Sequence, residues 1–272
     1  MKRNYAIVSI SFLLLPIICF AQPSLNTDYF KSVATGDWSA LASWQSSHDD
    51  ITYFPATLVP ASTATSILIQ NLHTVTISTA GISLKNTTIQ SGGILQLTLT
   101  APYTIGGAGD NLVVENGGIL LLNFTTLSAP LGTGTALIKT GGKVIANSAG
   151  SVAAADAIGD NYLNINSQFT YQDKSIFEWS IANYIFNQTG IQNYFKTPLI
   201  TDIPILRIST APIAAFGTSK NNLLNCILEV NAPFNIAGSG IKTFRGGLTG
   251  ASVINQTAGN IVLPNSTSVL DG

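Results

Sequence analysis

The sequence predicts an all-β fold, a right-handed parallel β-helix with an N-terminal cap, and three observations lead there. The chain carries only 12 basic and 13 acidic residues in 272, whereas an average soluble domain has roughly a quarter of its residues charged. Pairs of glycines recur at a nearly constant interval. Residues 64–150 contain no apolar stripe with the 3.6-residue period of a helix. A β-sandwich with an uncharged polar surface is the alternative fold.

Residues 1–21 have the pattern of a secretory signal peptide. Basic Lys2 and Arg3 precede a short apolar stretch that Pro16 interrupts, and small Ala21 ends the segment before Gln22. The stretch is too short for a membrane span, and no later apolar run approaches the roughly 18 residues that a span needs. We therefore expect a secreted or cell-surface protein with no membrane span after cleavage. The mature chain would keep one cysteine, Cys226, as a small buried residue without a disulfide.

Residues 22–65 are expected to form the cap of the solenoid. They contain Trp38 and Trp44, and the ends of stacked repeats are typically covered by a distinct segment. Large rings here would close the first coil.

Residues 66–272 are expected to form the coils. Three segments align: Thr88–Leu95, Val113–Leu120 and Leu137–Val144, with first glycines at positions 92, 117 and 141. Each has a β-prone run, a polar residue, Gly-Gly and a second apolar run, which is typical of two strands joined by a tight corner. A looser copy covers Val253–Val262.

Stacked coils also explain the shortage of charges. Equivalent residues of successive coils lie about 4.8 Å apart, so rows of like charge repel while apolar and uncharged polar rows attract. Residues 72–155 hold only five charged residues, Lys85, Asp110, Glu115, Lys139 and Lys143.

Residues 151–200 are expected to be less regular and are rich in aromatic residues. Rings beside Asn and Gln side chains suit stacking on sugars, and an extracellular polysaccharide or another cell-surface component is the candidate partner. The alternative is that the rings pack inside a wider coil. The candidate binding residues are Tyr171, Trp179, Tyr184 and Tyr194.

Two stretches resemble a known group of proteins. Gly36-Asp37-Trp38-Ser39, Ser43-Trp44 and Ile67–Ile77 resemble the N-terminal region of Bacteroidota-type secreted surface proteins, and the order is distantly similar to the eight-glycine domain. Gly240–Gly250 is similar to a later part of such proteins. The resemblance implies a right-handed parallel β-helix, an adhesin-like role and type IX secretion.

Two details differ from that group. It usually has Asp where Thr65 or Ser66 stands and Gly where Leu72 stands. Its members often end in a sorting domain, which is not visible before Gly272, so we expect an N-terminal fragment of a longer protein.

Residues suited to catalysis are scarce. His48 and His73 lack the partners that a zinc site or a Ser-His-Asp triad requires, so no metal or cofactor is expected. A net charge of −1 disfavours nucleic acid as a partner. The sequence thus predicts a non-catalytic surface scaffold. A polysaccharide hydrolase or lyase is the alternative, and its candidate carboxylates are Asp156, Asp160, Asp173 and Glu178.

Overall fold

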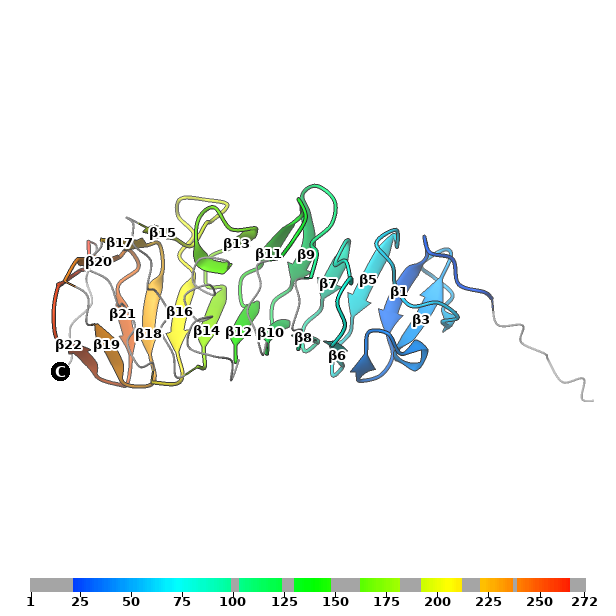
Figure 1. Ribbon diagram of the computed structural model, residues 1–272, viewed down its shortest axis with the longest axis horizontal. Helices are drawn as coiled ribbons and strands as arrows, with labels where there is room; N and C mark the ends of the chain where they lie inside the picture. Colours follow the sequence, from blue (N-terminus) through cyan, green and yellow to red (C-terminus); the bar gives the residue numbers. More distant parts are fainter. Residues whose placement is uncertain are drawn as a thin grey trace, which may run out of the picture.

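The computed structural model describes residues 22–98, 103–123, 130–147, 162–181, 192–211, 221–236 and 239–264. They form an elongated β-solenoid whose strands stack along the long axis (Figure 1). Strands of consecutive coils pair in parallel, and antiparallel strand pairs among these residues join only β1 to β3 and β3 to β4. The parallel β-helix predicted from the sequence is confirmed, because a β-sandwich is built from antiparallel strands. Within the described ranges, no helix is long and apolar enough to cross a membrane.

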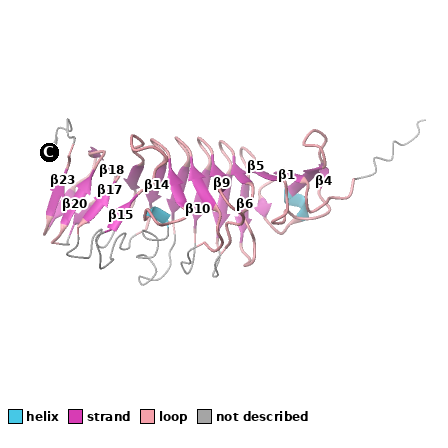
Figure 2. Ribbon diagram, turned by 90° about the horizontal axis from the view of Figure 1, so that it is seen from above, coloured by secondary structure: helices cyan, strands magenta, loops and turns pink. Residues whose placement is uncertain are grey.

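Two long sheets form most of the solenoid (Figure 2). The first sheet contains β1 (Tyr29–Ser32), β3 (Trp44–Ser47), β4 (Phe54–Pro55), β5 (Ser66–Ile69), β7 (Thr87–Ile89), β9 (Asp110–Val114), β11 (Thr135–Ile138) and β13 (Phe169–Tyr171). The second sheet contains β2 (Gly36–Asp37), β6 (Thr74–Ile77), β8 (Ile94–Leu97), β10 (Ile119–Leu122), β12 (Lys143–Ala146), β14 (Ile176–Trp179), β16 (Ile205–Ile208), β18 (Ile227–Val230) and β21 (Leu248–Gly250).

The C-terminal part adds two smaller sheets. The third sheet contains β15 (Gln192–Tyr194), β17 (Asn222–Leu224), β20 (Ile241–Phe244) and β23 (Asn260–Val262). The fourth sheet pairs β19 (Phe234–Ile236) with β22 (Ile254–Gln256). From β15 onward, a strand of the third sheet takes the place that a strand of the first sheet holds in earlier coils. The short 3-10 helix η1 (Leu41–Ser43) lies near the N-terminus.

The glycine pairs form the corners between the first and second sheets, as the sequence predicts. Gly92, Gly117 and Gly141 have φ angles of 75°, 76° and 76°, which glycine adopts at little cost. Their amides also form a ladder along the stack: Gly92 N–H donates to the Gly117 carbonyl and Gly117 N–H to the Gly141 carbonyl, at 3.0 and 3.1 Å. Leu72 and Lys174 continue this row with φ angles of 64° and 54°, so the corner persists where glycine is missing.

The looser copy at Val253–Val262 is not an equivalent corner, so this part of the repeat prediction is wrong. It joins β22 of the fourth sheet to β23 of the third sheet. The equivalent corner lies at Gly246 and Gly247, where Gly247 N–H donates to the Phe244 carbonyl at 3.2 Å. Similar spacing of apolar residues at two different corners produced the mistaken alignment.

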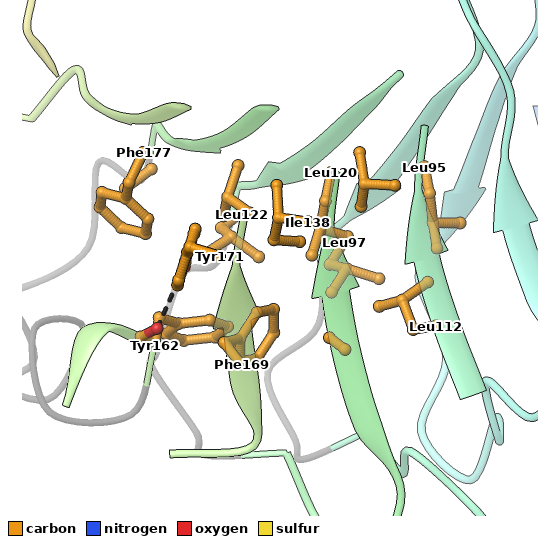
Figure 3. Packing of buried hydrophobic residues seen from close by; sticks show 14 of the residues in the cluster. Leu95, Leu97, Leu112, Leu120, Leu122, Ile138, Tyr162, Phe169, Tyr171 and Phe177 are labelled. Carbon is orange, nitrogen blue, oxygen red and sulfur yellow. Dashed lines mark hydrogen bonds between the residues drawn. The ribbon is translucent and has the colours of Figure 1, made fainter. Parts of the chain in front are cut away.

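The core lies between the sheets and follows the alternation of each strand. In the second sheet, Leu95, Leu120, Val144 and Phe177 are paired in register on successive coils and are buried. Figure 3 shows such rows, with Leu97, Leu122 and Ile138 packed between the sheets. Each fully buried aliphatic side chain stabilises the fold by about 1.5–3 kcal/mol relative to its exposed state.

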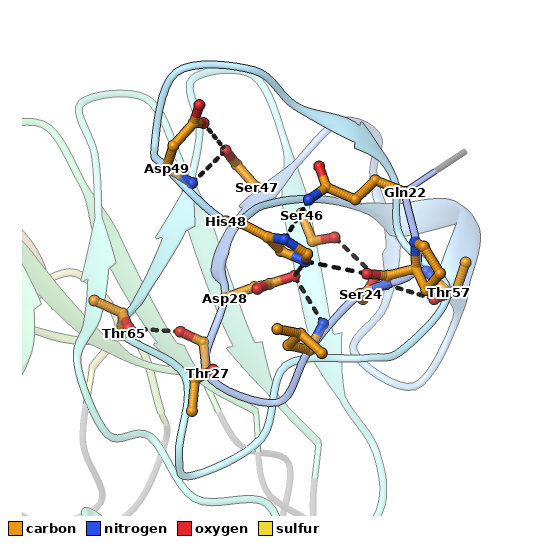
Figure 4. A network of polar contacts seen from close by, with 12 residues as sticks. Gln22, Ser24, Thr27, Asp28, Ser46, Ser47, His48, Asp49, Thr57 and Thr65 are labelled. Atoms are coloured by element: carbon orange, nitrogen blue, oxygen red, sulfur yellow. Dashed lines mark hydrogen bonds and ion pairs between the residues drawn. The ribbon is translucent and has the colours of Figure 1, made fainter. Parts of the chain in front are cut away.

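The segment before β5 covers the first coil. β1 pairs with β5, and β2 pairs with β6, so neither strand of that coil presents a free edge. Trp38 and Trp44 are buried with their rings in an edge contact, and the centroids are 5.1 Å apart. A polar network around the buried Asp28 and the exposed His48 holds the N-terminal residues against this cap (Figure 4).

Candidate binding groove

The predicted aromatic binding residues lie in the core wherever the structure describes them. Tyr171 and Trp179 are fully buried and Tyr194 is 1% exposed. Tyr171 donates its hydroxyl to the Tyr162 carbonyl at 3.0 Å (Figure 3), and Trp179 Nε1 donates to the Ile181 carbonyl at 2.8 Å. These rings offer no open face to a sugar, which corrects the sequence interpretation. Tyr184 lies outside the described residues.

Strand register explains why these rings are buried. Tyr171 pairs with Ile138 of the coil before, and Trp179 pairs with Ala146. Both partners are buried core residues, and a side chain that continues a stacked row must point to the same side of its sheet.

Two of the four candidate carboxylates lie among the described residues, and both have structural partners. Asp156 and Asp160 lie outside the described residues. Asp173 Oδ1 accepts a hydrogen bond from the Ile203 amide at 3.1 Å. Glu178 accepts a hydrogen bond from the Ser209 hydroxyl at 2.8 Å and lies 3.7 Å from Arg207 Nη1.

Glu178 belongs to a charged row on the outer face of the second sheet. Arg207 pairs with Glu178 on one side and Glu229 on the other in strand register, and it donates to both oxygens of Glu229 at 2.9 and 3.0 Å. Burial alone would raise the pKa of Glu229, but hydrogen bonds from Arg207 and Asn231 outweigh it and lower that pKa. The row is thus a stabilising ladder of alternating charge across three coils.

A groove of about 430 Å³ is lined by residues of β15 and β17 and of the corners that follow β15, β17 and β20, together with Ile165; Figure 1 labels these three strands. It exists because the corner after β15 is long, spanning residues 195–204, whereas the next corners span only 225–226 and 245–247. The lining residues come from four successive coils and are Ile165, Asn193, Tyr194, Phe195, Lys196, Thr197, Ile200, Leu223, Asn225 and Arg245.

The buried side of the groove is held in a strained conformation. Phe195 has a φ angle of 66°, which costs an aromatic residue about 1–2 kcal/mol. Its ring is buried and packs edge-on against Tyr171 with centroids 5.2 Å apart. Its amide donates to the Leu163 carbonyl at 2.6 Å. These contacts hold the backbone where the long corner turns away from the coil.

The accessible side of the groove is mixed in character. Ile165, Ile200 and Leu223 are 40%, 76% and 46% exposed, so they present aliphatic surface to solvent. Lys196 and Asn193 are exposed beside them. Aliphatic surface next to amide and cationic groups can contact both the C–H faces and the polar substituents of a ligand.

The polar residues of the groove form a connected set. Asn225 donates from Nδ2 to Thr197 Oγ1 at 3.2 Å and to the Asp202 carbonyl at 3.3 Å. These bonds direct Asn225 Oδ1 to Arg245, whose Nη1 donates to it at 3.1 Å. The guanidinium is therefore positioned by an amide that is itself fixed.

The histidines and the cysteine have structural roles. Ser32 Oγ and His73 Nδ1 are 2.9 Å apart, so the ring is hydrogen-bonded to the end of β1 just before β6 begins. Cys226 is free and buried, and burial raises the pKa of its thiol. In the part of the chain that the structure describes, no three His, Cys, Asp or Glu residues are grouped as a metal site would require.

Comparison with protein-family models, with curated proteins and with solved structures finds no match to this chain. The resemblance to secreted surface proteins therefore stays a prediction.

Proposed function

We propose that this chain is an exported β-helical scaffold of the cell surface that binds a glycan in the groove beside β15, β17 and β20 and has no catalytic activity. The observation that carries the proposal is the mixed lining, in which exposed aliphatic side chains lie next to Asn193, Asn225 and two cations. A sugar has apolar C–H faces and many hydroxyl groups, so it needs both kinds of contact. The volume of about 430 Å³ falls within the usual range for small-ligand sites.

Two further features support parts of the proposal. The signal-peptide pattern of residues 1–21 supports export. Asp173 and Glu178 are engaged with a backbone amide and with Arg207 and Ser209. Both carboxylates therefore have contacts within the fold that join neighbouring coils.

The proposal is tested with a glycan array followed by affinity electrophoresis of the full chain. We expect retention on at least one polysaccharide. The double variant Ile200→Ser/Leu223→Ser should weaken it about tenfold or more, because each exposed aliphatic side chain contributes on the order of 1 kcal/mol when a ligand covers it. Ile51→Ser is the matched control, since Ile51 is 82% exposed and lies outside the groove.

Two results would contradict the proposal. The proposed glycan binding is wrong if the chain is retained on no polysaccharide, or if the double variant is retained as strongly as the unmodified chain. The non-catalytic role fails if incubation with the retained polysaccharide releases shorter fragments.

A further inference from the structure

We infer that the groove selects an anionic glycan, whose carboxylate or sulfate ester is held by Arg245 and Lys196. The inference rests on the proposed function, since it names the class of ligand for the same groove. It starts from the charge of the lining, which contains these two cations and no acidic residue.

The two arginines in the described part of the chain differ in their partners. Arg207 lies against the carboxylates of Glu178 and Glu229. Arg245 donates to the neutral amide of Asn225, and no described carboxylate lies within ion-pair distance of it. A guanidinium has five N–H donors in a fixed planar arrangement that matches two oxygens of one anion. Arg245 therefore keeps donors and its full charge for a ligand.

Lys196 is a second cation on the same groove. It is exposed, and its backbone carbonyl accepts a hydrogen bond from the Tyr171 amide at 2.8 Å, which fixes the base of the side chain. No described acidic residue forms an ion pair with it. The nearby carboxylate of Asp202 is buried and closes the 199–202 turn by accepting from the Leu199 amide at 3.1 Å.

The placement of these groups suits a chain-like ligand. Ile165, Lys196, Asn225 and Arg245 come from four successive coils, and coils stack at about 4.8 Å. The lining thus extends on the order of 14 Å along the solenoid axis, which is three such steps. Aliphatic residues along this length can contact sugar rings while the cations contact acidic substituents.

The test measures binding of the full chain to three soluble polysaccharides at physiological salt with a chelator present: polygalacturonate, dextran sulfate and unmodified dextran. We expect retention on one or both anionic polymers, at least tenfold stronger than on dextran. Retention on polygalacturonate alone identifies the anion as a carboxylate, and retention on dextran sulfate alone identifies it as a sulfate ester.

The variants separate a defined site from general attraction to a polyanion. Arg245→Gln should weaken retention by about tenfold to a hundredfold, the usual range for a charged hydrogen-bonded contact, and Lys196→Gln should weaken it less. Arg245→Lys keeps the charge but loses the bidentate geometry, so its retention should lie between those of the unmodified chain and Arg245→Gln. Lys85→Gln removes a charge beside β7 and should leave retention unchanged.

Failure of this inference is distinguishable from failure of the proposed function. If a neutral polysaccharide is retained as strongly as the anionic ones and Arg245→Gln has no effect, the groove binds glycans but the anionic class is wrong. An equal loss in Lys85→Gln and Arg245→Gln would also overturn the inference, because binding would then follow total charge. If no polysaccharide in the array is retained, the proposed function fails as well.

Discussion

Adding one methyl group at the second glycine of a corner should destabilise the solenoid strongly, and Gly118→Ala is the sharpest case. A Cβ atom at Gly118 would lie 2.6 Å from the Ile89 carbonyl oxygen, short of the van der Waals optimum of about 3.5 Å. That oxygen also accepts the Glu115 amide at 2.9 Å. Relief therefore requires the backbones of two neighbouring coils to separate.

The magnitude follows from these two effects. Inserting a methyl group into packed structure costs about 1–3 kcal/mol, and weakening one ladder hydrogen bond costs about 1 kcal/mol. We expect a loss of about 3 kcal/mol or more. Gly81→Ala is the matched control, because Gly81 has a φ angle of 86° with nothing within 4 Å of its added Cβ atom. Conformational strain alone should cost it about 1 kcal/mol.

Equilibrium unfolding in urea, followed by tryptophan fluorescence, separates the two variants. With an m-value of about 3 kcal/mol per molar, the midpoint should fall by about 1 M for Gly118→Ala and by about 0.3 M for Gly81→Ala. Equal shifts, or a larger shift for Gly81→Ala, would refute the idea that close backbone approach is what requires glycine at this corner.

Three further predictions concern described residues outside the groove. Arg207→Met should lower the free energy of unfolding by about 2 kcal/mol at neutral pH, because it removes the cation that lies between Glu178 and Glu229. The pKa of Glu229 is lowered from 4.5 in the folded state, so the stability that Glu229 contributes is present above pH 4.5 and lost as pH falls below it. Urea titrations should therefore show that the difference in free energy of unfolding between the variant and the unmodified chain shrinks in acid. A difference that stays constant with pH would contradict the charged ladder. Cys226 should resist a thiol reagent in native buffer and react fully in denaturant, and fast native labelling would contradict its burial. Trp44→Phe should cost about 1–3 kcal/mol, because it leaves a buried carbonyl without the donor now 2.8 Å away; an unchanged urea midpoint would count against the cap arrangement.

The coil repeat could be predicted from the sequence because its signal is local. Each corner needs glycine or another residue at positive φ within a few positions of two alternating strands, and that combination is visible without knowledge of the fold. The same signal misplaced the copy at Val253–Val262, since a glycine after an apolar strand marks a corner without saying which sheets it joins.

The buried rings show a signal that the sequence interpretation missed. Phe169 and Tyr171 alternate with Thr170, and Phe177 and Trp179 alternate with Glu178, which is the spacing of inward-facing positions on a strand. The aromatic richness of the whole segment suggested a binding surface, but the two-residue period within each strand was the better guide.

The groove could not be predicted in the same way. Its lining comes from four coils, and the residues that meet depend on how far each corner extends between strands. Asn225 and Arg245 are single polar residues that directly follow β17 and β20. Only the stacked register brings them together.

The few charged residues of the coils lie at particular positions of the stack. Amides of Glu115, Lys139 and Arg245 each donate to the residue that ends the corresponding strand of the coil before, so these side chains belong to one row of corner positions. Within that row Lys139 Nζ lies 2.7 Å from Glu115 of the neighbouring coil. Stacking thus tolerates charge where the next coil supplies the opposite sign.

Arg245 departs from this arrangement. Its neighbour one coil before is Asn225, which accepts a hydrogen bond but carries no charge to balance the guanidinium. Among the described residues no carboxylate forms an ion pair with Arg245, and a bound anion would supply the opposite charge that Glu115 supplies to Lys139. Because that attraction is electrostatic at a partly exposed site, binding should weaken as salt is raised, whereas contacts with Ile200 and Leu223 should persist.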